Sequence, residues 1–553
     1  MQMQHPSDSP SPFHQTRSDP ECGFRVGQRI HWIGDTGRIG TVKYVGPVEG
    51  YSGTWVGVDW DSDGDGKHDG SHNSVKYFAA KGLRTASFVR PHNLSSGISL
   101  LQALEARYLT LSTKEEEDEM YVLSARNKKV SIELLGKDKI QDKLSQFEEL
   151  TSASLSYLGV SSAGSPNHIS STLPRLKELD LTGNLLAEWE DVGIICKALP
   201  SLAALNLSYN SMSCDITTMP QLNNIRILVL NHTGVIWKQV EMLKCSLPCI
   251  EELHLLGNKL REITPVSSTG VQGFDFLRRL NLEDNCIADW EEILKFSQLK
   301  SLEQLFLNKN DLNRIWYPDC GTTRESGNGY ESLDKNLRPF KTLQCLLLGG
   351  NKIEDLDSVD SLNSFPNLVD IRLSENPIAD IGKGGVPRFV LIARLAKVEI
   401  LNGSEVSPRE RKDSEIRYVR LVMSKFHNNP EEVTRLHPRF AELKRIHGIE
   451  DERPLTGATG PQKMASGLIS VSFKCVGASM GEKPPVMKKL PATTTVGKLK
   501  NLCQSFFKLK SVKPVLFLQE QGSPLPTLLE DDMASLIELG VGNESTILVD
   551  EES

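Results

Sequence analysis

The most regular feature of the chain is a spacing of leucine and isoleucine residues that repeats through its middle part. The pattern L-x-x-L-x-L-x-x-N occurs in eight clear copies, which start at residues 176, 202, 225, 250, 277, 302, 343 and 368. Seven copies end in Asn, and the copy that starts at residue 225 ends in Thr233. A degenerate copy, LTSASLSYL, precedes them at 150–158. Because one repeat cannot bury its apolar positions alone, the copies are predicted to stack into a solenoid of short parallel strands.

The template resembles the leucine-rich repeat, so we predict an α/β leucine-rich-repeat solenoid with a C-terminal cap over residues 145–406. The Asn is expected to turn the chain and to satisfy backbone groups in the bend. The segment after the last repeat, RFVLIARLAKVEILNGSEVSPRERKDSE, resembles the C-terminal cap of the short repeat proteins that include the protein phosphatase regulator. Residues 317–336 are rich in Gly, Ser and Asp and predict a loop inserted in one repeat.

The strand positions between the leucines are predicted to face the concave surface of the solenoid. They are mostly polar, which leaves two interpretations open: a solvated sheet face, or a docking surface for a protein. These positions include Lys177, Glu178, Asp180, Asn206, Tyr209, Glu251, Glu252, His254, Arg278, Arg279, Glu303, Phe306 and Arg372.

A second pattern lies near the N-terminus, where short apolar segments alternate with glycines and turn residues. RIHWI, GTVKYVG, TWVGVDW, VKYF and SFVRP predict a small all-β domain over residues 23–95. This region contains Gly66-Lys67-His68-Asp69-Gly70, preceded by Gly53-x-Trp55-Val56-Gly57-Val58 and followed by Tyr77-Phe78 and Phe88-Val89-Arg90. With these motifs it resembles a CAP-Gly domain.

Domains of that family bind acidic C-terminal tails that end in Glu-Glu-Tyr/Phe, as on α-tubulin. The resemblance implies a tubulin-tail-binding site made of Tyr51, Trp55, Gly66, Lys67, His68, Asp69, Gly70 and Phe88. Lys67 and His68 would meet the tail carboxylates, and the aromatic residues would line the groove. His68 stands where the family has Asn, so it offers one ring donor in place of a carboxamide, and its effect on affinity and pH dependence stays open. A domain that keeps the fold without binding a tail is the alternative.

A competing motif overlaps this loop. Asp61-x-Asp63-x-Asp65-Gly66 matches the opening of an EF-hand calcium loop. Position twelve is His72 in place of the bidentate Glu, and the flanking segments read as strands, so we expect a solvated turn and no metal site.

The C-terminal part follows a third pattern. LISVSFKCV, VMKKLP, TTVGKLKNLCQSFFKL, PVLFLQE and STILVDE give the order β-β-α-β with a final strand. This order resembles an α+β ubiquitin-like (β-grasp) domain over 467–553, and its ending Asp-Glu-Glu-Ser, without Gly-Gly, suggests docking and not conjugation. We further predict a disordered N-terminus (1–22), a helical connector (96–144), a helical extension (407–447) and a linker (448–466).

Composition and charge narrow the function classes. The 553 residues carry a net charge of −8, which disfavours general nucleic-acid binding. The N-terminal segment has no apolar core, no stretch is long enough to span a membrane, and ten scattered cysteines indicate reduced thiols in the cytoplasm. The close pair Cys245 and Cys249 lacks a second pair at zinc spacing. No phosphate loop, nucleophile elbow or zinc helix motif occurs, so we expect neither an enzyme nor a cofactor.

The order of the three modules resembles the tubulin-folding cofactor E family of tubulin-specific chaperones. The resemblance implies a cytoplasmic, cytoskeleton-associated protein that binds α-tubulin and acts in folding, assembly or dissociation of the αβ-tubulin heterodimer. It also implies tubulin-folding cofactors C and D, cofactor B, and an Arf-like GTPase as partners. The alternative is a microtubule-associated adapter that binds tubulin tails without remodelling dimers, and a more distant one is a phosphatase-regulating solenoid.

Overall fold

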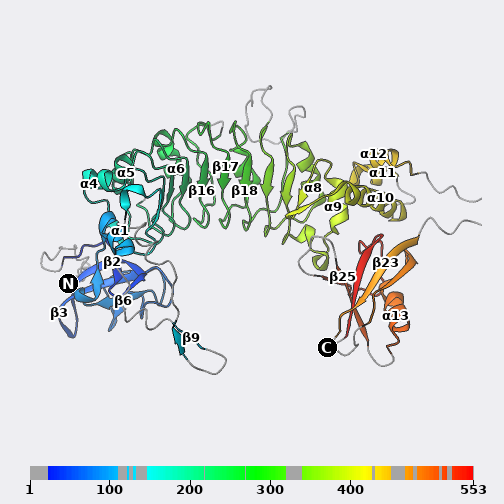
Figure 1. Ribbon diagram of the computed structural model, residues 1–553, viewed down its shortest axis with the longest axis horizontal. Helices are drawn as coiled ribbons and strands as arrows, with labels where there is room; N and C mark the ends of the chain where they lie inside the picture. The colour runs from blue at the N-terminus through cyan, green and yellow to red at the C-terminus, as the bar shows by residue number, and fades with distance from the viewer. Residues whose placement is uncertain are drawn as a thin grey trace, which may run out of the picture. The chain divides into compact units, whose positions relative to one another are not determined.

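The computed structural model of the protein has two compact units. Figure 1 labels the helices and strands and colours them by residue number. The first comprises Met1–Ser268 and Gln272–Asn281, and the second comprises Thr269–Val271 and Leu282–Ser553. The segments predicted to be a disordered N-terminus, an inserted loop and a linker lie wholly or mostly outside the described residues. The residues described are 23–109, 121–123, 129–131, 146–213, 215–216, 218–267, 270–318, 339–425, 430–449, 468–477, 483–509, 513–519 and 526–551.

The first unit begins with a five-stranded antiparallel sheet in the order β6-β3-β2-β1-β7. Alternate residues of its strands point to one face and form a core that includes Ile30, Val42, Val58 and Trp60. A short hairpin, β4–β5, lies outside this sheet. The elements are β1 (Arg29–Trp32), β2 (Asp35–Val48), β3 (Tyr51–Trp60), β4 (Ser71–His72), β5 (Val75–Lys76), β6 (Ala86–Val89), the 3-10 helix η1 (Pro91–Asn93) and β7 (Leu94–Ser95).

The connector to the solenoid is only partly helical. Helix α1 (Leu100–Tyr108) starts at a capping box in which Ser99 and Gln102 exchange hydrogen bonds. The strands β9 (Tyr121–Leu123) and β10 (Lys129–Ser131) form an antiparallel hairpin, so the prediction of a helical connector is wrong for these segments. Tyr and Val, which favour strands, occupy them. The strand β8 (Ile98–Ser99) pairs in parallel with β12 (Val160–Ser162), and η2 (Phe147–Glu149) follows the hairpin along the chain.

In the first unit the repeats form a parallel sheet in which each strand contributes its central residue to the core. The central residues of neighbouring strands lie opposite one another, in the order Ala153, Leu179, Leu205, Leu228, Leu253 and Leu280. The degenerate copy supplies the first of these strands. The strands are β11 (Ser152–Ser154), β13 (Glu178–Asp180), β14 (Ala204–Asn206), β15 (Ile227–Val229), β16 (Glu252–His254) and β17 (Arg279–Asn281).

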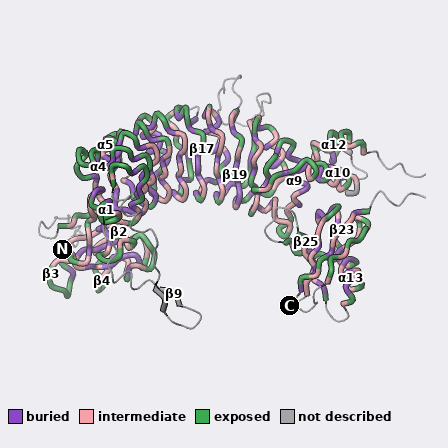
Figure 2. Tube along the Cα trace, viewed as in Figure 1, coloured by how far each residue is buried: buried purple, intermediate pink, exposed green. Residues whose placement is uncertain are grey.

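In the second unit the same pattern continues. Leu305, Leu346, Ile371 and Leu401 lie opposite one another in parallel strands, and a last antiparallel strand ends the sheet. Buried positions recur along the trace of the repeats (Figure 2). The strands are β18 (Gln304–Phe306), β19 (Cys345–Leu347), β20 (Asp370–Arg372), β21 (Ile400–Leu401) and β22 (Ser404–Glu405).

Helices return the chain between the strands. Three of them, α5 (Trp189–Ala198), α6 (Trp237–Leu243) and α7 (Trp290–Leu294), begin with a tryptophan that is at least 97% buried. A large apolar side chain at the first position anchors the start of each helix to the core. The others are α4 (Pro166–Thr172), η3 (Lys244–Ser246), α8 (Leu356–Ser361), η4 (Leu362–Ser364), η5 (Pro377–Ala379) and η6 (Ile381–Lys383).

The repeat asparagines are buried and join neighbouring turns. The Asn184 side chain donates to the carbonyls of Leu155 and Leu181, both at 2.9 Å, and accepts from the N–H of Val160 at 2.8 Å. Each such side chain therefore satisfies backbone groups that would otherwise be buried without partners. Asn210, Asn310, Asn351 and Asn376 make the same two kinds of bond.

One repeat departs from this arrangement. Thr233 occupies the Asn position, and its hydroxyl reaches only the carbonyl of Leu230 within its own repeat and the side chain of Asn258. The N–H of Met212 donates to the backbone carbonyl of Thr233 at a long 3.3 Å, where an Asn side chain would have accepted. The Thr233 hydroxyl thus bonds within its own repeat and to the following one, while Gln239 donates to the carbonyl of Ser213 at 2.8 Å across the junction with the preceding repeat.

Tyr209 does not lie on the strand face as predicted. It follows β14 in the turn before Asn210, at a φ of 59°, and its ring stacks on His232 at 4.7 Å. The equivalent position is glycine at 183, 257 and 350, where left-handed backbone geometry costs least, and it carries a side chain at positive φ in the other repeats. The aromatic ring therefore belongs to the edge of the solenoid, and not to the surface formed by its strands.

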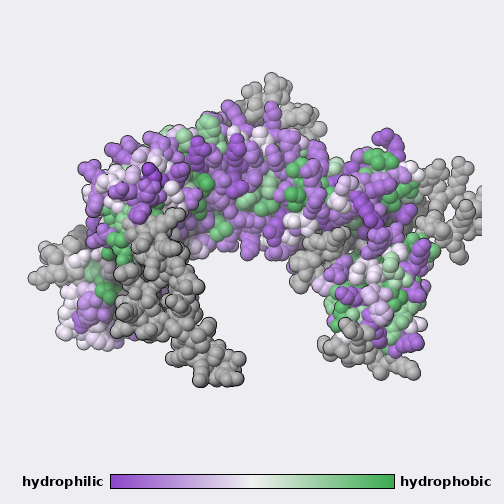
Figure 3. Space-filling view, viewed as in Figure 1, coloured by the Kyte–Doolittle hydropathy of each residue, from purple (hydrophilic) through white to green (hydrophobic). Residues whose placement is uncertain are grey.

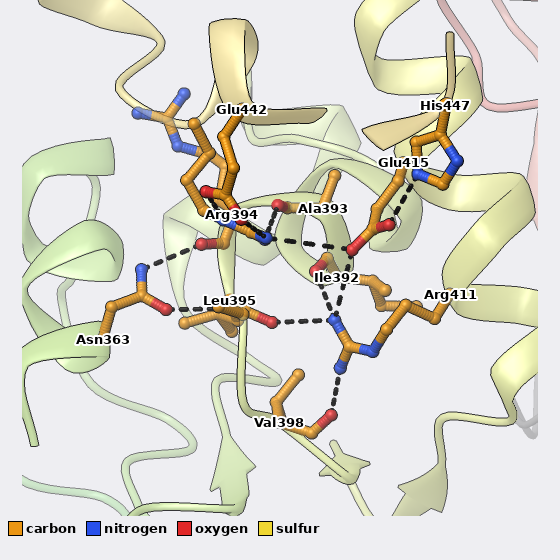
Figure 4. A network of polar contacts seen from close by, with 12 residues as sticks. Asn363, Ile392, Ala393, Arg394, Leu395, Val398, Arg411, Glu415, Glu442 and His447 are labelled. Atoms are coloured by element: carbon orange, nitrogen blue, oxygen red, sulfur yellow. Dashed lines mark hydrogen bonds and ion pairs between the residues drawn. The ribbon is translucent and has the colours of Figure 1, made fainter. Parts of the chain in front are cut away.

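A helical cap follows the last repeats. Arg394, 1% exposed, donates to both carboxylate oxygens of Asp360 and to the Tyr418 hydroxyl. Arg411 donates to three main-chain carbonyls, those of Ile392, Leu395 and Val398, while Glu415 accepts from His447 at 2.8 Å (Figure 4). This polar network holds the helical cap on the C-terminal end of the repeats. Its helices are α9 (Arg388–Arg394), α10 (Pro408–Lys425), α11 (Pro430–Leu436) and α12 (Phe440–Ile446).

The C-terminal part of the second unit is a five-stranded sheet in the order β24-β23-β27-β25-β26, packed against one helix. The strands β23 and β27 are parallel and the other neighbours antiparallel. Val471, Phe473, Leu499 and Leu516 lie in the shared core. The elements are β23 (Leu468–Cys475), β24 (Val486–Pro491), α13 (Val496–Phe507), β25 (Pro514–Gln519), β26 (Thr527–Leu528) and β27 (Ser545–Glu551).

We expect Asn258→Leu to lower the free energy of unfolding of the solenoid by about 2–5 kcal/mol, because the N–H groups of Thr233 and Gly234 lose their buried acceptor. Leu280→Asp buries an unpaired carboxylate and should lower the free energy of unfolding by at least as much. Urea unfolding of the full chain followed by tryptophan fluorescence measures both, with exposed Arg261→Leu as control. An unchanged unfolding midpoint for Asn258→Leu would contradict the structural role of the asparagines.

Candidate functional site

The Gly66–Gly70 loop is pinned to the neighbouring strand by its backbone. The N–H of Lys67 donates to the carbonyl of Ala86 at 2.7 Å, and the N–H of Ala86 donates to the carbonyl of His68 at 2.9 Å. The N–H of Gly66 donates to the carbonyl of Arg84 at 2.9 Å. These bonds fix the loop backbone while the Lys67 side chain stays exposed.

The two glycines that frame the loop leave no room for a side chain. A Cβ on Gly66 would lie 2.2 Å from the carbonyl carbon of Thr85, and one on Gly70 would lie 2.2 Å from the carbonyl oxygen of Phe78. Gly70 also has a φ of +95°, which side chains rarely adopt. Both residues therefore allow the loop to approach its neighbours closely.

Asp69 is engaged within the loop. Its carboxylate accepts from the N–H of Ser71 at 3.1 Å. Hydrogen bonds from Ser71 keep the pKa of the Asp69 carboxyl below its usual value, so this group is ionised at neutral pH. Its contribution to the site is to shape the turn that presents the two preceding side chains.

Phe88 lies at the centre of an aromatic cluster. The ring of His68 stacks on it with centroids 4.9 Å apart and planes 29° apart. Tyr77, Phe78 and Tyr44 meet the same ring edge-on, at 5.1, 5.7 and 6.1 Å. Phe88 therefore places His68 against a wall of rings beside the glycine loop.

A second aromatic group adjoins the first. Tyr51, 52% exposed, lies 5.7 Å from Trp55 and 5.4 Å from the ring of His72. His72 in turn lies 6.5 Å from Phe88, so it joins the two groups. The guanidinium of Arg90 covers the Trp55 ring at 3.8 Å, a cation–π contact.

The structure thus links the predicted residues Tyr51, Trp55, His68 and Phe88 through ring contacts, and the loop places Lys67 beside His68. Sequence reasoning missed Tyr44, Tyr77, His72 and Arg90 as members of this site. Tyr77 belongs to the Tyr77-Phe78 motif, and Tyr44 lies in GTVKYVG, a predicted strand. Tyr44 lies next to a register shift in β2, and the face that a side chain takes in a bulged strand depends on register, which the sequence alone does not give.

The first carboxylate of the acidic run before the loop makes ion pairs within the domain. The Asp61 carboxylate is bound by the guanidinium of Arg29 and by the ammonium of Lys81 at 3.3 Å. Burial opposes ionisation of Asp61, but these two cations outweigh it and hold its pKa below the usual value. Across the described ranges no group of three or more His, Cys, Asp or Glu side chains could hold a metal ion.

The N-terminal part is thus a small antiparallel domain that holds a pinned glycine loop, an exposed ammonium group and a surface of aromatic rings. Residues 26–94 match the family model of the CAP-Gly domain. This match confirms the predicted CAP-Gly domain, which the chain combines with a leucine-rich-repeat solenoid and a ubiquitin-like domain.

The similarity to known proteins extends far beyond that domain. The chain is 64% identical over 530 residues to tubulin-folding cofactor E of Arabidopsis thaliana, which covers 96% of this chain and 98% of the relative. It is 32% identical over 505 residues to tubulin-specific chaperone E of Danio rerio, a match that covers 88% of this chain and 91% of the relative. The chain belongs to the tubulin-folding cofactor E family, and the prediction of that family is confirmed.

A solved structure of the C-terminal ubiquitin-like domain of mouse tubulin-specific chaperone e is 26% identical to this chain, covers 18% of it and 96% of the mouse domain, and gives a TM-score of 0.15. In the parts of the chain that the structure describes, no helix has the length and apolar character needed to cross a membrane.

We expect Gly66→Ala to destabilise the CAP-Gly domain by about 1–3 kcal/mol or more, because the added methyl group would meet backbone atoms that cannot move aside. Gly37→Ala is the matched control, since its Cβ would make only an ordinary 3.4 Å contact with Asp35. Thermal unfolding of the full chain measures both variants. Equal melting curves for the two would show that the loop is not held as described.

Proposed function

We propose that this protein is a tubulin-specific chaperone whose CAP-Gly domain binds the acidic C-terminal tail of α-tubulin. It acts in folding, assembly or dissociation of the αβ-tubulin heterodimer and so supports microtubule biogenesis. The observation that carries the proposal is the exposed Lys67 on a pinned loop beside an aromatic cluster, in a chain of the tubulin-folding cofactor E family. The role is binding and not catalysis.

The chemistry of the site suits such a tail. A peptide that ends in Glu-Glu-Tyr carries several carboxylates, and Lys67 offers them an exposed ammonium group. A terminal aromatic side chain can pack edge-on against Tyr51, Trp55 or Phe88. Because the loop backbone is already fixed, binding costs little ordering of the protein.

Tail binding alone cannot remodel a dimer. A flexible tail is equally available in the free subunit and in the heterodimer, so it does not favour either state. We assign the discrimination to the solenoid, whose strand face carries charged groups such as the Glu252–Arg279 pair at 2.8 Å. In the view of Figure 3 the surface of the repeats is mostly hydrophilic.

The remaining partners follow from the family. We propose that the protein works in the cytoplasm, in association with the cytoskeleton, with tubulin-folding cofactors C and D, with cofactor B and with an Arf-like GTPase. The ubiquitin-like domain is a second docking arm. Linked contacts on one client multiply because the first raises the effective concentration for the second.

We expect Lys67→Glu to weaken binding of a Glu-Glu-Tyr-ended peptide at least tenfold, because repulsion replaces attraction near the tail carboxylates. Arg25→Glu makes the same charge change at an exposed position outside the aromatic cluster and should bind like the unmodified chain. Calorimetry on the full chain measures both affinities. Unchanged binding by Lys67→Glu would remove Lys67 from the site.

Deleting residues 1–95 should leave dimer dissociation intact at high protein concentration and abolish it at low concentration, since only the tail contact is lost. Purified tubulin dimers incubated with the full chain and with the 96–553 fragment over a range of concentrations give the test. Inertness of the fragment at every concentration would refute this division of roles. Decoration of microtubules without loss of dimers, by the full chain, would favour the adapter function.

A further inference from the structure

The sheet of the ubiquitin-like domain ends on one side in strand β24. This strand pairs with β23 from Val486 to Pro491, and within the described residues no strand pairs with its other side. Every second residue of an antiparallel edge strand directs its N–H and C=O away from the neighbouring strand. All six residues of β24 are at least partly exposed. The open edge therefore offers unpaired main-chain groups to a further strand.

One face of β24 combines apolar residues with a lysine. Val486, Lys488 and Leu490 lie opposite residues of β23 that are buried in the core shared with helix α13, so they face the helix side of the sheet. Val486 and Leu490 pack partly buried against that core. Between them the ammonium group of Lys488 lies 5.1 Å from the centre of the Phe506 ring. A charged side chain thus takes the middle position of a half-buried apolar row.

Helix α13 continues this surface. The ring of Phe506 packs against Phe473 with centres 5.8 Å apart, and Leu502 lies one turn before Phe506 on the same stripe of the helix. Both Leu502 and Phe506 are only partly buried, so apolar surface stays accessible beside the open edge. The term β24–α13 surface is used below for Val486, Lys488, Leu490, Leu502 and Phe506.

The lysines along this edge have no acidic partner among the described residues. Lys488, Lys489 and Lys498 are exposed, and none of them forms an ion pair with a described carboxylate. Lys500, also on α13, by contrast pairs with Asp532 at 2.7 Å. A second copy of β24 would bring these charges against their own kind, and like charges on paired strands are destabilising. The edge therefore disfavours another copy of this chain and suits a strand that carries carboxylates.

We propose that the β24–α13 surface is a second peptide-binding site of the chain, which takes an extended acidic segment of a partner protein as an additional strand beside β24. Main-chain bonds to the open edge hold the segment, its apolar side chains cover Val486 and Leu490, and its carboxylates meet Lys488 and Lys489. The inference specifies the docking role proposed for the ubiquitin-like domain and rests on that role. It does not depend on tail recognition by the CAP-Gly domain.

The register of the edge determines which sequence fits. Side chains alternate between the two faces of a strand, so a segment antiparallel to β24 needs apolar residues opposite Val486 and Leu490 and a carboxylate opposite Lys488. A second carboxylate, on the outer face, lies opposite Lys489. The pattern Val-Glu-Glu-Thr-Val meets these conditions. Blocking both ends of such a peptide removes the free carboxylate that a C-terminal tail carries.

The first test locates the peptide on the full chain. The probe is acetyl-Ser-Val-Glu-Glu-Thr-Val-Ser-amide, and the chain carries Lys67→Glu so that the CAP-Gly loop does not attract an acidic peptide. We expect hydrogen exchange, followed by mass spectrometry, to slow in residues 486–490 when the probe is added, and to stay unchanged with the peptide in which both Glu are Gln. Unchanged exchange with the probe, or equal protection by the Gln peptide, would overturn the proposal.

The second test measures affinity for the fluorescein-labelled probe by fluorescence anisotropy, in the same Lys67→Glu chain. We expect Lys488→Glu to weaken binding at least about fivefold and Lys488→Gln about twofold, because the first reverses the charge and the second only removes it. Lys474→Glu is the matched control. It follows Phe473 in β23, so its side chain takes the opposite face of the sheet, and binding should stay within about twofold.

Equal affinities of Lys488→Glu and Lys474→Glu would refute the site. Thermal unfolding shows whether each variant is folded, and Lys488→Gln, which keeps the length of the side chain, decides the matter if Lys488→Glu is not. Binding of phosphatidylserine vesicles that Lys488→Glu abolishes, without binding of the peptide, would assign these lysines to an anionic membrane and overturn the proposal.

The outcomes distinguish this inference from the proposed tail recognition. Failure of a Glu-Glu-Tyr-ended peptide to bind the unmodified chain would remove tail recognition and leave the β24–α13 surface unaffected, because the probe is tested in a chain that already lacks Lys67. Failure of the probe, with tail binding intact, would remove only the second site.

Discussion

The solenoid depends on how buried main-chain groups in its turns find hydrogen-bond partners. Each turn leaves the sheet where water cannot reach it, and an unpaired N–H or C=O in that place would cost about 1–3 kcal/mol. The repeat asparagine solves this with one side chain that both donates and accepts, as Asn184 does between its own turn and the preceding one. The leucines supply the apolar core, but the asparagines fix where each turn is placed. The strands, and with them the polar face we assign to client docking, inherit their spacing from these bonds.

The CAP-Gly loop meets the same constraint by a different route. Its backbone pairs directly with Ala86, and Gly66 and Gly70 make that approach possible because they carry no Cβ. The Lys67 side chain is thereby left exposed, whereas the ring of His68 accepts from the N–H of Gly70 and stacks on Phe88. A rigid backbone that holds exposed polar side chains is the arrangement that favours recognition of a flexible, charged peptide.

The sequence was most informative where a pattern has one physical solution. The repeat template determined the parallel strands and buried leucines, and the glycine motif located the loop, because only glycine fits those two positions. It was least informative where geometry depends on contacts distant along the chain. Tyr209 was assigned to the strand face but lies in a turn, since the copy length does not show where each strand ends. The hairpin β9–β10 was missed because two three-residue strands are too short for periodicity to distinguish. His72 lies in β4 and Arg90 follows β6, and both join the site only through contacts with Tyr51 and Trp55 that the folded chain creates.

Thr233 gives the array an uneven mechanical character. In a linear array each repeat is stabilised only by its neighbours, so the whole behaves like a chain whose cooperativity is limited by its weakest interface. The hydroxyl of Thr233 has one hydrogen to donate, whereas the amide of an asparagine has two. The N–H of Met212 donates to a main-chain carbonyl at 3.3 Å in place of a side-chain oxygen. Gln239, which donates to the carbonyl of Ser213 at 2.8 Å, and the stack of Tyr209 on His232 join the same two repeats. The load between these repeats is therefore carried by side chains on a helix and at the edge of the solenoid, in place of the amide that links the other turns.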